Sequence, residues 1–183
     1  MPIRNEDESW PYIERFTPAR AADQQQRLGY LPVFQNIGLR FDNVAEDYTR
    51  ASMEPSTDLV RPKGMFQGGM LATLVDTVAG QALRTTLKDD HDAVTIHLDT
   101  KCFRPISEER VFAEGVVVRK GRSLAHIDVA VVSEQGALVA RGWCVFKLTR
   151  RRETEPPQDH LPEAKPPALP ESTCDGLQGG MGI

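Results

Sequence analysis

Residues 64–86 read GMFQGGMLATLVDTVAGQALRTT, and the architecture of the chain follows from them. A glycine-rich entry is followed by about 18 residues with helical spacing of apolar side chains. On a helical wheel one set of apolar residues falls within about 60° and forms a single stripe: Leu71, Leu74, Val75, Val78 and Ala82. The sequence therefore predicts one long helix with one face in the core.

Two features of this helix are not needed for helicity. Asp76 lies on the flank of the apolar stripe beside small residues, and Gly80 costs about 1 kcal/mol relative to alanine, which predicts close packing against it. The Gln67-Gly68-Gly69 entry lets a ligand approach the backbone, and first-turn amides attract a developing oxyanion. Periodicity alone favours the plainer interpretation, a core helix after a glycine turn with a solvated aspartate.

The composition limits the classes of function. With 183 residues, 40% hydrophobic and 26% charged, the chain is most simply one globular domain with tails. A net charge of −4 argues against nucleic acid as a partner. The acidic start is unlike a targeting peptide, and no apolar run approaches the ~20 residues of a membrane span, so we expect a cytoplasmic protein with no membrane partner.

The three cysteines have no Cys-x-x-Cys spacing, so the sequence predicts neither a disulfide framework nor a metal site. We interpret Cys102 and Cys144 as small apolar core residues. The chain divides into an N-terminal extension (1–30), a folded domain (31–148) and a Pro/Gly-rich tail (149–183) that we expect to be disordered.

Alternating apolar residues predict the strands. A weak first strand is predicted before the helix and four longer ones after it: 46–53, 94–103, 111–119, 124–133 and 137–148. The pattern places Val94, Ile96, Leu98 and Cys102 on one face, and Leu138 on the same face as Ala140. One long helix and such strands pack most economically when an antiparallel sheet curls around the helix. The predicted fold class is therefore α+β, in the hotdog arrangement.

Three motifs resemble those of hotdog-fold acyl-CoA thioesterases of the phenylacetate-pathway type, over roughly residues 31–148. They are Gly64-x-x-Gln67-Gly68-Gly69 followed by Asp76, then Lys120-Gly121-Arg122-Ser123, and the pattern of residues 136–142. The resemblance implies hydrolysis of an acyl- or aryl-acyl-CoA thioester to free acid and CoA. It assigns the amide donor to Gly68, the acid to Asp76 and a water-placing hydroxyl to Thr95.

Two positions depart from the family pattern. Gln67 stands where the family usually has histidine, and it can orient a substrate but cannot shuttle a proton. Arg61 stands where asparagine or glutamine is common, and its cation would either hold Asp76 ionised or fill the position of the water.

Further residues are candidates for contact with the substrate. Arg61, Phe66 and Gly69 surround the helix entry. The coenzyme phosphates would meet the hairpin residues Arg119, Lys120, Arg122 and Ser123, although a charged turn kept for solubility explains these residues equally well. Since CoA is part of the substrate, we expect no separate cofactor and no metal.

Gly68 and Asp76 are eight residues apart, which is about 12 Å along one helix, so they cannot both touch one carbonyl. If both serve one site, a second subunit must supply the missing group, which predicts a homodimer with antiparallel helices, or a tetramer of such dimers. Whether Asp76 acts as nucleophile or general base stays open. The alternatives are an acyl-CoA binder without catalysis and a lyase acting on an enoyl or hydroxyacyl thioester.

Overall fold

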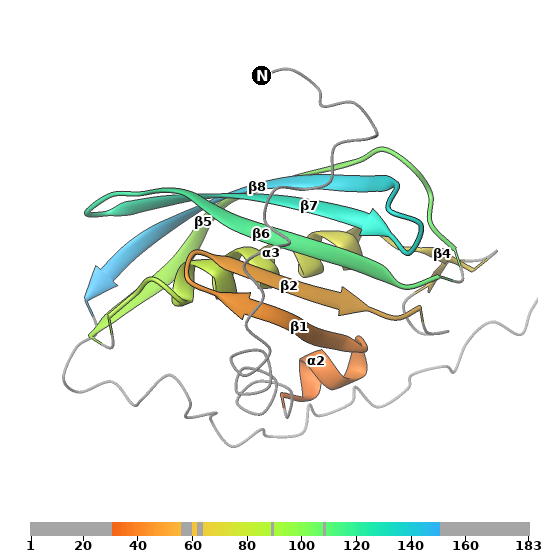
Figure 1. The fold of residues 1–183 in the computed structure, drawn as a ribbon, viewed down its shortest axis with the longest axis horizontal. Helices are drawn as coiled ribbons and strands as arrows, with labels where there is room; N and C mark the ends of the chain where they lie inside the picture. Colours follow the sequence, from red (N-terminus) through yellow and green to blue (C-terminus); the bar gives the residue numbers. More distant parts are fainter. Residues whose placement is uncertain (1–30, 56–59, 62–63, 89, 108, 151–183) are drawn as a thin grey trace, which may run out of the picture. The chain divides into compact units, whose positions relative to one another are not determined.

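The computed structural model describes residues 31–55, 60–61, 64–88, 90–107 and 109–150. In these ranges a six-stranded antiparallel sheet wraps around the 17-residue helix α3 (Gly68–Arg84), as Figure 1 shows. The strand order is β1-β2-β6-β7-β8-β5. The strands are β1 (Leu39–Ala45), β2 (Tyr48–Met53), β5 (His91–Cys102), β6 (Val111–Lys120), β7 (Leu124–Ser133) and β8 (Leu138–Arg150). This architecture confirms the predicted α+β hotdog fold.

Three short elements complete the described part of the chain. The helix α2 (Pro32–Asn36) precedes β1, and β3 (Val60–Arg61) pairs with β4 (Met65–Phe66) directly before α3. Strand β4 is held from its other side as well, because the amide of Phe66 donates to the carbonyl of Ile106 at 2.9 Å. The entry to α3 is therefore fixed by two neighbouring segments.

Helix α3 forms the centre of the core. The predicted apolar stripe is buried, with Leu71 at 3% exposure and the other four members at 0%. Ala79 and Leu83 are also fully buried against the sheet. Complete burial of an aliphatic side chain of this size contributes about 1.5–3 kcal/mol, so the stripe is a main source of the stability of the fold.

Two glycines let the sheet approach α3. A Cβ atom built on Gly142 would lie 2.2 Å from Cγ1 of Val75, and one on Gly115 would lie 2.8 Å from Cγ1 of Val78. Any side chain at these positions would force the helix and the sheet apart. At Gly80 a Cβ would meet the Phe146 ring at 3.8 Å, which is an ordinary contact. Among the described residues, the close packing predicted at Gly80 is therefore absent.

The three strands after residue 110 are those that the alternation predicts. Strand β7 has the predicted bounds, and its inward residues Ala125, Ile127, Val129 and Val131 are fully buried. The prediction for Leu138 was wrong, because its side chain is 41% exposed while Val139 is buried. The pairing of β7 with β8 shifts register between Val131 and Val132, and this irregularity changes which residues face the helix.

The region before α3 differs from its prediction. The weak strand at 46–53 is one arm of a hairpin, with β2 beginning at Tyr48 and the unpredicted strand β1 as the other arm. A register shift between Phe41 and Asn43 interrupts the alternation of β1. A strand whose period of two is broken in this way does not give the usual sequence signal.

The predicted common face of β5 is correct only in part. Leu98 and Cys102 lie opposite Cys144 and Ala140 of β8 and face α3, as does Thr95. Val94 is opposite Lys147 and points away, at 58% exposure. A bulge between Thr95 and His97 shifts the alternation, and strand β5 forms one edge of the sheet.

Within the described ranges, no helix is both long and apolar enough to cross a bilayer. Strand β8 continues to Arg150, past the predicted domain end at Leu148. The predicted N-terminal extension and almost all of the predicted disordered tail, residues 1–30 and 151–183, lie outside the described residues.

Candidate active site

The N-terminus of α3 is an open corner of backbone. Gln67 is the N-cap residue, has extended backbone angles (φ −71°, ψ 134°) and makes no capping bond with its side chain. Gln67, Gly68 and Gly69 are all exposed, and a Cβ on Gly69 would meet none of the described residues within 4 Å. First-turn amides lack intrahelical acceptors and lie at the positive end of the helix dipole. The corner is therefore suited to bind an oxyanion.

Asp76 lies on the third turn of the same helix and is half-buried. Its Oδ1 atom accepts a hydrogen bond of 3.0 Å from the hydroxyl of Thr95 on β5. The structure thus brings together two residues that are 19 positions apart and that the sequence had assigned to one site. The bond fixes the direction of the carboxylate and leaves its second oxygen available for a water or a carbonyl carbon.

The thiol of Cys144, on which the charge of Asp76 acts, is not a nucleophile. Burial, together with the negative charges of Asp76 and Asp128, raises the pKa of Cys144 to about 12. A thiol with such a pKa stays protonated at neutral pH. Cys144 is fully buried, as the sequence predicted for it.

The amide corner and the acid belong to one continuous helix, so their separation of about 12 Å along the axis holds in the folded chain. Within one subunit Gly68 and Asp76 cannot contact the same thioester carbonyl. In the described chain, the amide corner and the carboxylate are therefore two separate features of one helix.

The remaining candidates near the entry have different surroundings. Phe66 is 6% exposed and packs in the main core cluster. The backbone of Arg61 pairs with Met65, and its side chain lies outside the described residues. Leu83, at the other end of the helix, is fully buried. A hollow of about 210 Å³ lies elsewhere, at Trp143, Arg141 and their neighbours on β5, β7 and β8.

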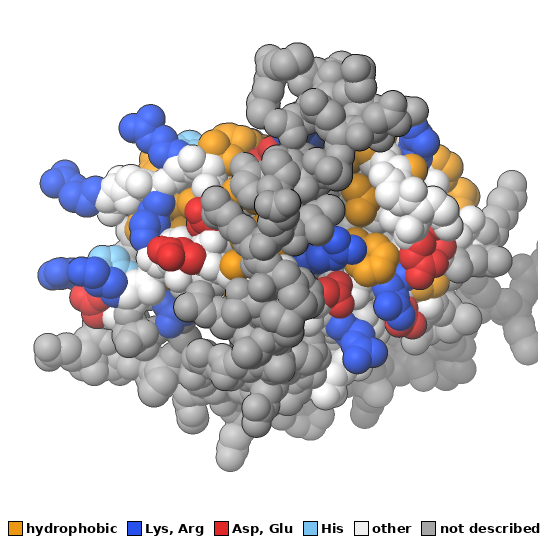
Figure 2. Space-filling model, in the orientation of Figure 1, with side chains coloured by type: hydrophobic (Ala, Val, Ile, Leu, Met, Phe, Trp, Pro, Cys, Tyr) orange, Lys and Arg blue, Asp and Glu red, His pale blue; other side chains and the backbone are white. Residues whose placement is uncertain are grey.

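Basic side chains gather near the C-terminal end of α3. Arg119, Lys120 and Arg122 are exposed at the β6–β7 hairpin, and Figure 2 shows Lys and Arg side chains clustered at this end of the molecule. The ammonium group of Lys120 donates to the carbonyl of Thr86, which ties the hairpin to the end of the helix. Ser123 contributes its carbonyl to the amide of Leu148 at 2.9 Å.

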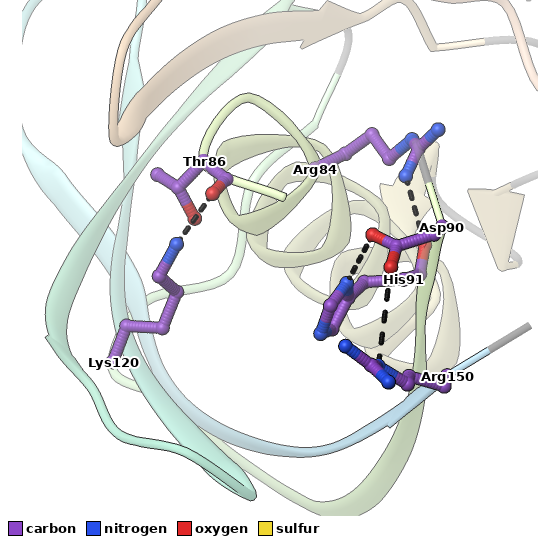
Figure 3. A network of polar contacts seen from close by, with 6 residues as sticks. All are labelled: Arg84, Thr86, Asp90, His91, Lys120 and Arg150. Carbon is purple, nitrogen blue, oxygen red and sulfur yellow. Dashed lines mark hydrogen bonds and ion pairs between the residues drawn. The ribbon is translucent and has the colours of Figure 1, made fainter. Parts of the chain in front are cut away.

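A second set of polar contacts lies on the other side of this helix end (Figure 3). Arg84 donates to the carbonyl of His91 at 3.2 Å, and the His91 ring contacts Asp90 at 2.6 Å. Arg150 approaches the same carboxylate at 3.9 Å. The hydrogen bond from His91 holds the pKa of Asp90 below its usual value. These contacts fix the ends of β5 and β8 beside the basic hairpin.

The position of Cys102 differs from its prediction. This residue is exposed rather than in the core, and its Sγ atom lies 4.0 Å from where a Cβ of Gly68 would be. No signal in the sequence shows this, because the position depends on β5 being the edge of the sheet next to the helix entry.

A long helix wrapped by an antiparallel sheet, with a glycine corner at its start and a carboxylate two turns later, defines a hotdog-fold protein with a candidate hydrolytic site. Comparisons with known proteins agree. The model of the thioesterase superfamily matches residues 63–140. The phenylacetic acid degradation protein PaaI of Thermus thermophilus, solved as a variant, is 30% identical, with 63% of this chain and 97% of that chain covered and a TM-score of 0.58.

Two further relatives support the same placement. The proofreading thioesterase EntH of Cronobacter turicensis is 24% identical over 63% of this chain and 81% of its own length. A thioesterase of Haemophilus influenzae shares the fold with a TM-score of 0.69 at 19% identity, over 73% of this chain and 93% of that one. The chain belongs to the thioesterase superfamily, and its activity class is thioester hydrolysis.

Proposed function

We propose that this protein hydrolyses acyl-CoA thioesters at two equivalent centres of a homodimer. The observation that carries the proposal is the Asp76 carboxylate, half-buried and oriented by Thr95, on the same helix as the exposed Gly68 amide. Each centre would combine Gly68 of one subunit with Asp76 and Thr95 of the other. A tetramer of such dimers is compatible with the same centres.

In this mechanism the carbonyl oxygen of the thioester accepts a hydrogen bond from the Gly68 amide. The oxyanion formed in the tetrahedral intermediate is stabilised there by about 3 kcal/mol, the usual contribution of one such donor. Asp76 either removes a proton from the attacking water or attacks the carbonyl carbon itself. The C–S bond then breaks, the CoA sulfur takes a proton, and the free acid leaves.

The basic hairpin fits the coenzyme end of the substrate. Ten residues separate Asp76 from Thr86, whose carbonyl binds Lys120, so the hairpin is about 15 Å along the axis from the acid. The pantetheine arm between thioester and diphosphate has a comparable extended length. Arg119 and Arg122, with Ser123 at the turn, would then face the phosphates, and Gln67, Arg61, Phe66 and Gly69 would surround the acyl end.

Replacement Asp76→Asn tests the proposal, because the amide keeps the shape and the acceptor for Thr95 but is neither base nor nucleophile. We expect a loss of kcat of about 10²-fold or more, with binding of the thioester retained. The assay follows thiol release from a panel of short-chain, long-chain and aryl-acyl CoA thioesters. Glu134→Gln, which removes an exposed acid in the turn between β7 and β8, is the matched control.

The assay also separates the alternatives. Tight binding of a thioester without hydrolysis by the unmodified protein would replace the proposal by an acyl-CoA binder. Hydration of an enoyl thioester would replace it by a lyase. A single turnover in heavy-oxygen water distinguishes the two roles of Asp76, since direct attack by water places the label in the acid product at once.

A further inference from the structure

The chain segment that leads into α3 is tied to the segment that follows β5. The amide of Phe66 donates to the carbonyl of Ile106 at 2.9 Å, and an isolated bridge joins β4 to Ser107. These contacts hold the two segments side by side. The last residue of β5, Cys102, therefore lies beside the first residue of the helix, Gly68.

Cys102 is the described side chain that touches the amide corner. Its Sγ atom lies 4.0 Å from where a Cβ of Gly68 would be. Apart from Gln67, Gly69 and the helix backbone, no other atom of the described residues lies within 4 Å of that position. A separation of 4.0 Å is an ordinary van der Waals contact. Because Cys102 is also exposed, a molecule bound at the corner can touch the thiol.

Pairing of the strand fixes the direction of the side chain at position 102. Cys102 lies opposite Ala140 of β8, whose side chain is fully buried, so both residues face the helix. The amide of the next residue, Phe103, donates to the carbonyl of Val139 at 2.8 Å. The strand is thus held on both sides of the contact, and a larger side chain at position 102 would also point at the helix entry.

The space at the corner is open on the side of Gly69, where a Cβ would meet none of the described residues within 4 Å. In the proposed mechanism the thioester oxygen accepts a hydrogen bond from the Gly68 amide, which places the carbonyl carbon about 4 Å from that nitrogen. The first carbons of the acyl group are then within contact distance of Cys102. A side chain larger than cysteine would exclude acyl substituents that the thiol admits.

We propose that Cys102 determines which acyl groups the protein accepts, by limiting the space beside the Gly68 amide. This inference rests on the proposed function for the nature of the substrate, and it adds a specificity-determining residue to that function. The role is steric, since Cys102 forms and breaks no bond in the reaction. One methylene group more or less in an apolar pocket changes specificity by about 10- to 200-fold, so the size of this residue has a measurable effect.

Replacement Cys102→Phe tests the proposal. The readout is kcat/KM for benzoyl-CoA divided by kcat/KM for acetyl-CoA. A general loss of folded or active protein lowers both values equally and leaves this ratio unchanged. We expect the ratio to fall about tenfold or more relative to the unmodified protein, while Cys102→Ala keeps it within about threefold.

Lys101→Phe is the matched control. It adds the same ring to the neighbouring residue of β5, whose side chain lies on the opposite face of the sheet, at the hollow beside Trp143. The ratio should stay that of the unmodified protein. An unchanged ratio in Cys102→Phe, or an equal fall in both variants, would overturn the proposal.

Reversible modification tests the same point in a protein that is already folded. In a Cys174→Ser background, the Cys102 thiol loses its proton to the buffer, attacks benzyl methanethiosulfonate, forms a benzyl disulfide and releases methanesulfinate. The adduct should lower the ratio about tenfold or more, the smaller methyl adduct should lower it less, and dithiothreitol should restore it. Cys102→Ala in this background should not respond, because the pKa of the remaining thiol, Cys144, is raised to about 12. A benzyl adduct with an unchanged ratio would contradict the proposal even if Cys102→Phe failed to fold.

The outcome is separable from that of the proposed function. Hydrolysis with a ratio that does not respond to changes at Cys102 would keep the hydrolase and end this inference. Binding of both thioesters without hydrolysis would end the hydrolase proposal, and the ratio of their two dissociation constants in Cys102→Phe would then test the inference. Absence of binding to either thioester would overturn both.

Discussion

The packed side of helix α3 and its N-terminal corner have opposite surroundings. One side packs against β6 and β8 so closely that Gly115 and Gly142 cannot carry a Cβ. The N-terminal corner, with Gly68, Gly69 and Cys102, is exposed, and in the described part of the chain no residue lies close to Gly69. Tight packing on one side fixes the position of the helix, so the backbone amides of the open corner are held in place even though few side chains surround them.

Cys102 and Cys144, the cysteines of the described ranges, should show this contrast most strongly. Burial raises the pKa of Cys144 to about 12, which lowers its thiolate fraction about 10³-fold relative to an ordinary thiol. Iodoacetamide should therefore modify Cys102 long before Cys144 in the folded protein, as peptide mass mapping over time would show. Equal rates in native buffer, with both sites reacting equally after unfolding in urea, would contradict the described packing.

The next largest effect is expected from adding a side chain at Gly142, where the sheet lies close to helix α3. Gly142→Ala places a methyl group against Val75, and we expect a loss of about 3 kcal/mol in the free energy of unfolding from overpacking. Urea denaturation followed by circular dichroism measures it. Gly121→Ala, at a hairpin turn where the nearest atom is 3.4 Å away, is the control with little change expected. If Gly142→Ala left the free energy of unfolding unchanged, the sheet would have to lie further from the helix than described.

At the basic end of α3, Arg122→Ala tests the interaction with coenzyme phosphates. We expect KM for a CoA thioester to rise about tenfold with kcat unchanged, because a phosphate interaction of equal strength in the ground state and the transition state affects binding alone. The same acyl group on pantetheine, which lacks the diphosphate, should show no change. Arg40→Ala, an exposed arginine on β1, serves as control. An equal rise for both substrates would place the phosphates elsewhere.

The smallest effect is expected at Gly80, where the helix faces the Phe146 ring of β8 without close packing. A methyl group there meets the Phe146 ring at an ordinary distance, so Gly80→Ala should stabilise the helix by up to about 1 kcal/mol. The urea midpoint at several protein concentrations measures it. Destabilisation that disappears on dilution would instead show that a second subunit packs on Gly80, which would revise the position of the dimer axis.

Much of the fold could be predicted because its signals are local. The apolar stripe of α3 and the alternation of β7 come from side-chain periodicity, and both are found where predicted. Strand β1 and the faces of β5 could not be predicted in this way. Each contains a bulge, and an extra residue reverses the alternation on which such a prediction depends.

The residues of the candidate site also divide into those that the sequence predicts and those that only the structure places. Asp76 and Gly68 could be found from the helix sequence, and their separation on one helix follows from its rise per residue. The bond from Thr95 to Asp76 agrees with what the family resemblance implied, but its length and direction required the structure. Cys102 was assigned to the core, because apolar residues on a strand are buried in most proteins and the sequence does not mark which strand is an edge.

The sequence by itself determined the helix, the strands of regular alternation and the chemistry available on α3, since these depend on neighbours along the chain. Only the tertiary structure decided which strand forms the edge of the sheet, where the bulges fall and which side chains lie beside the amide corner. Those features arise from pairing between distant segments, and pairing energies depend on contacts that no local pattern records.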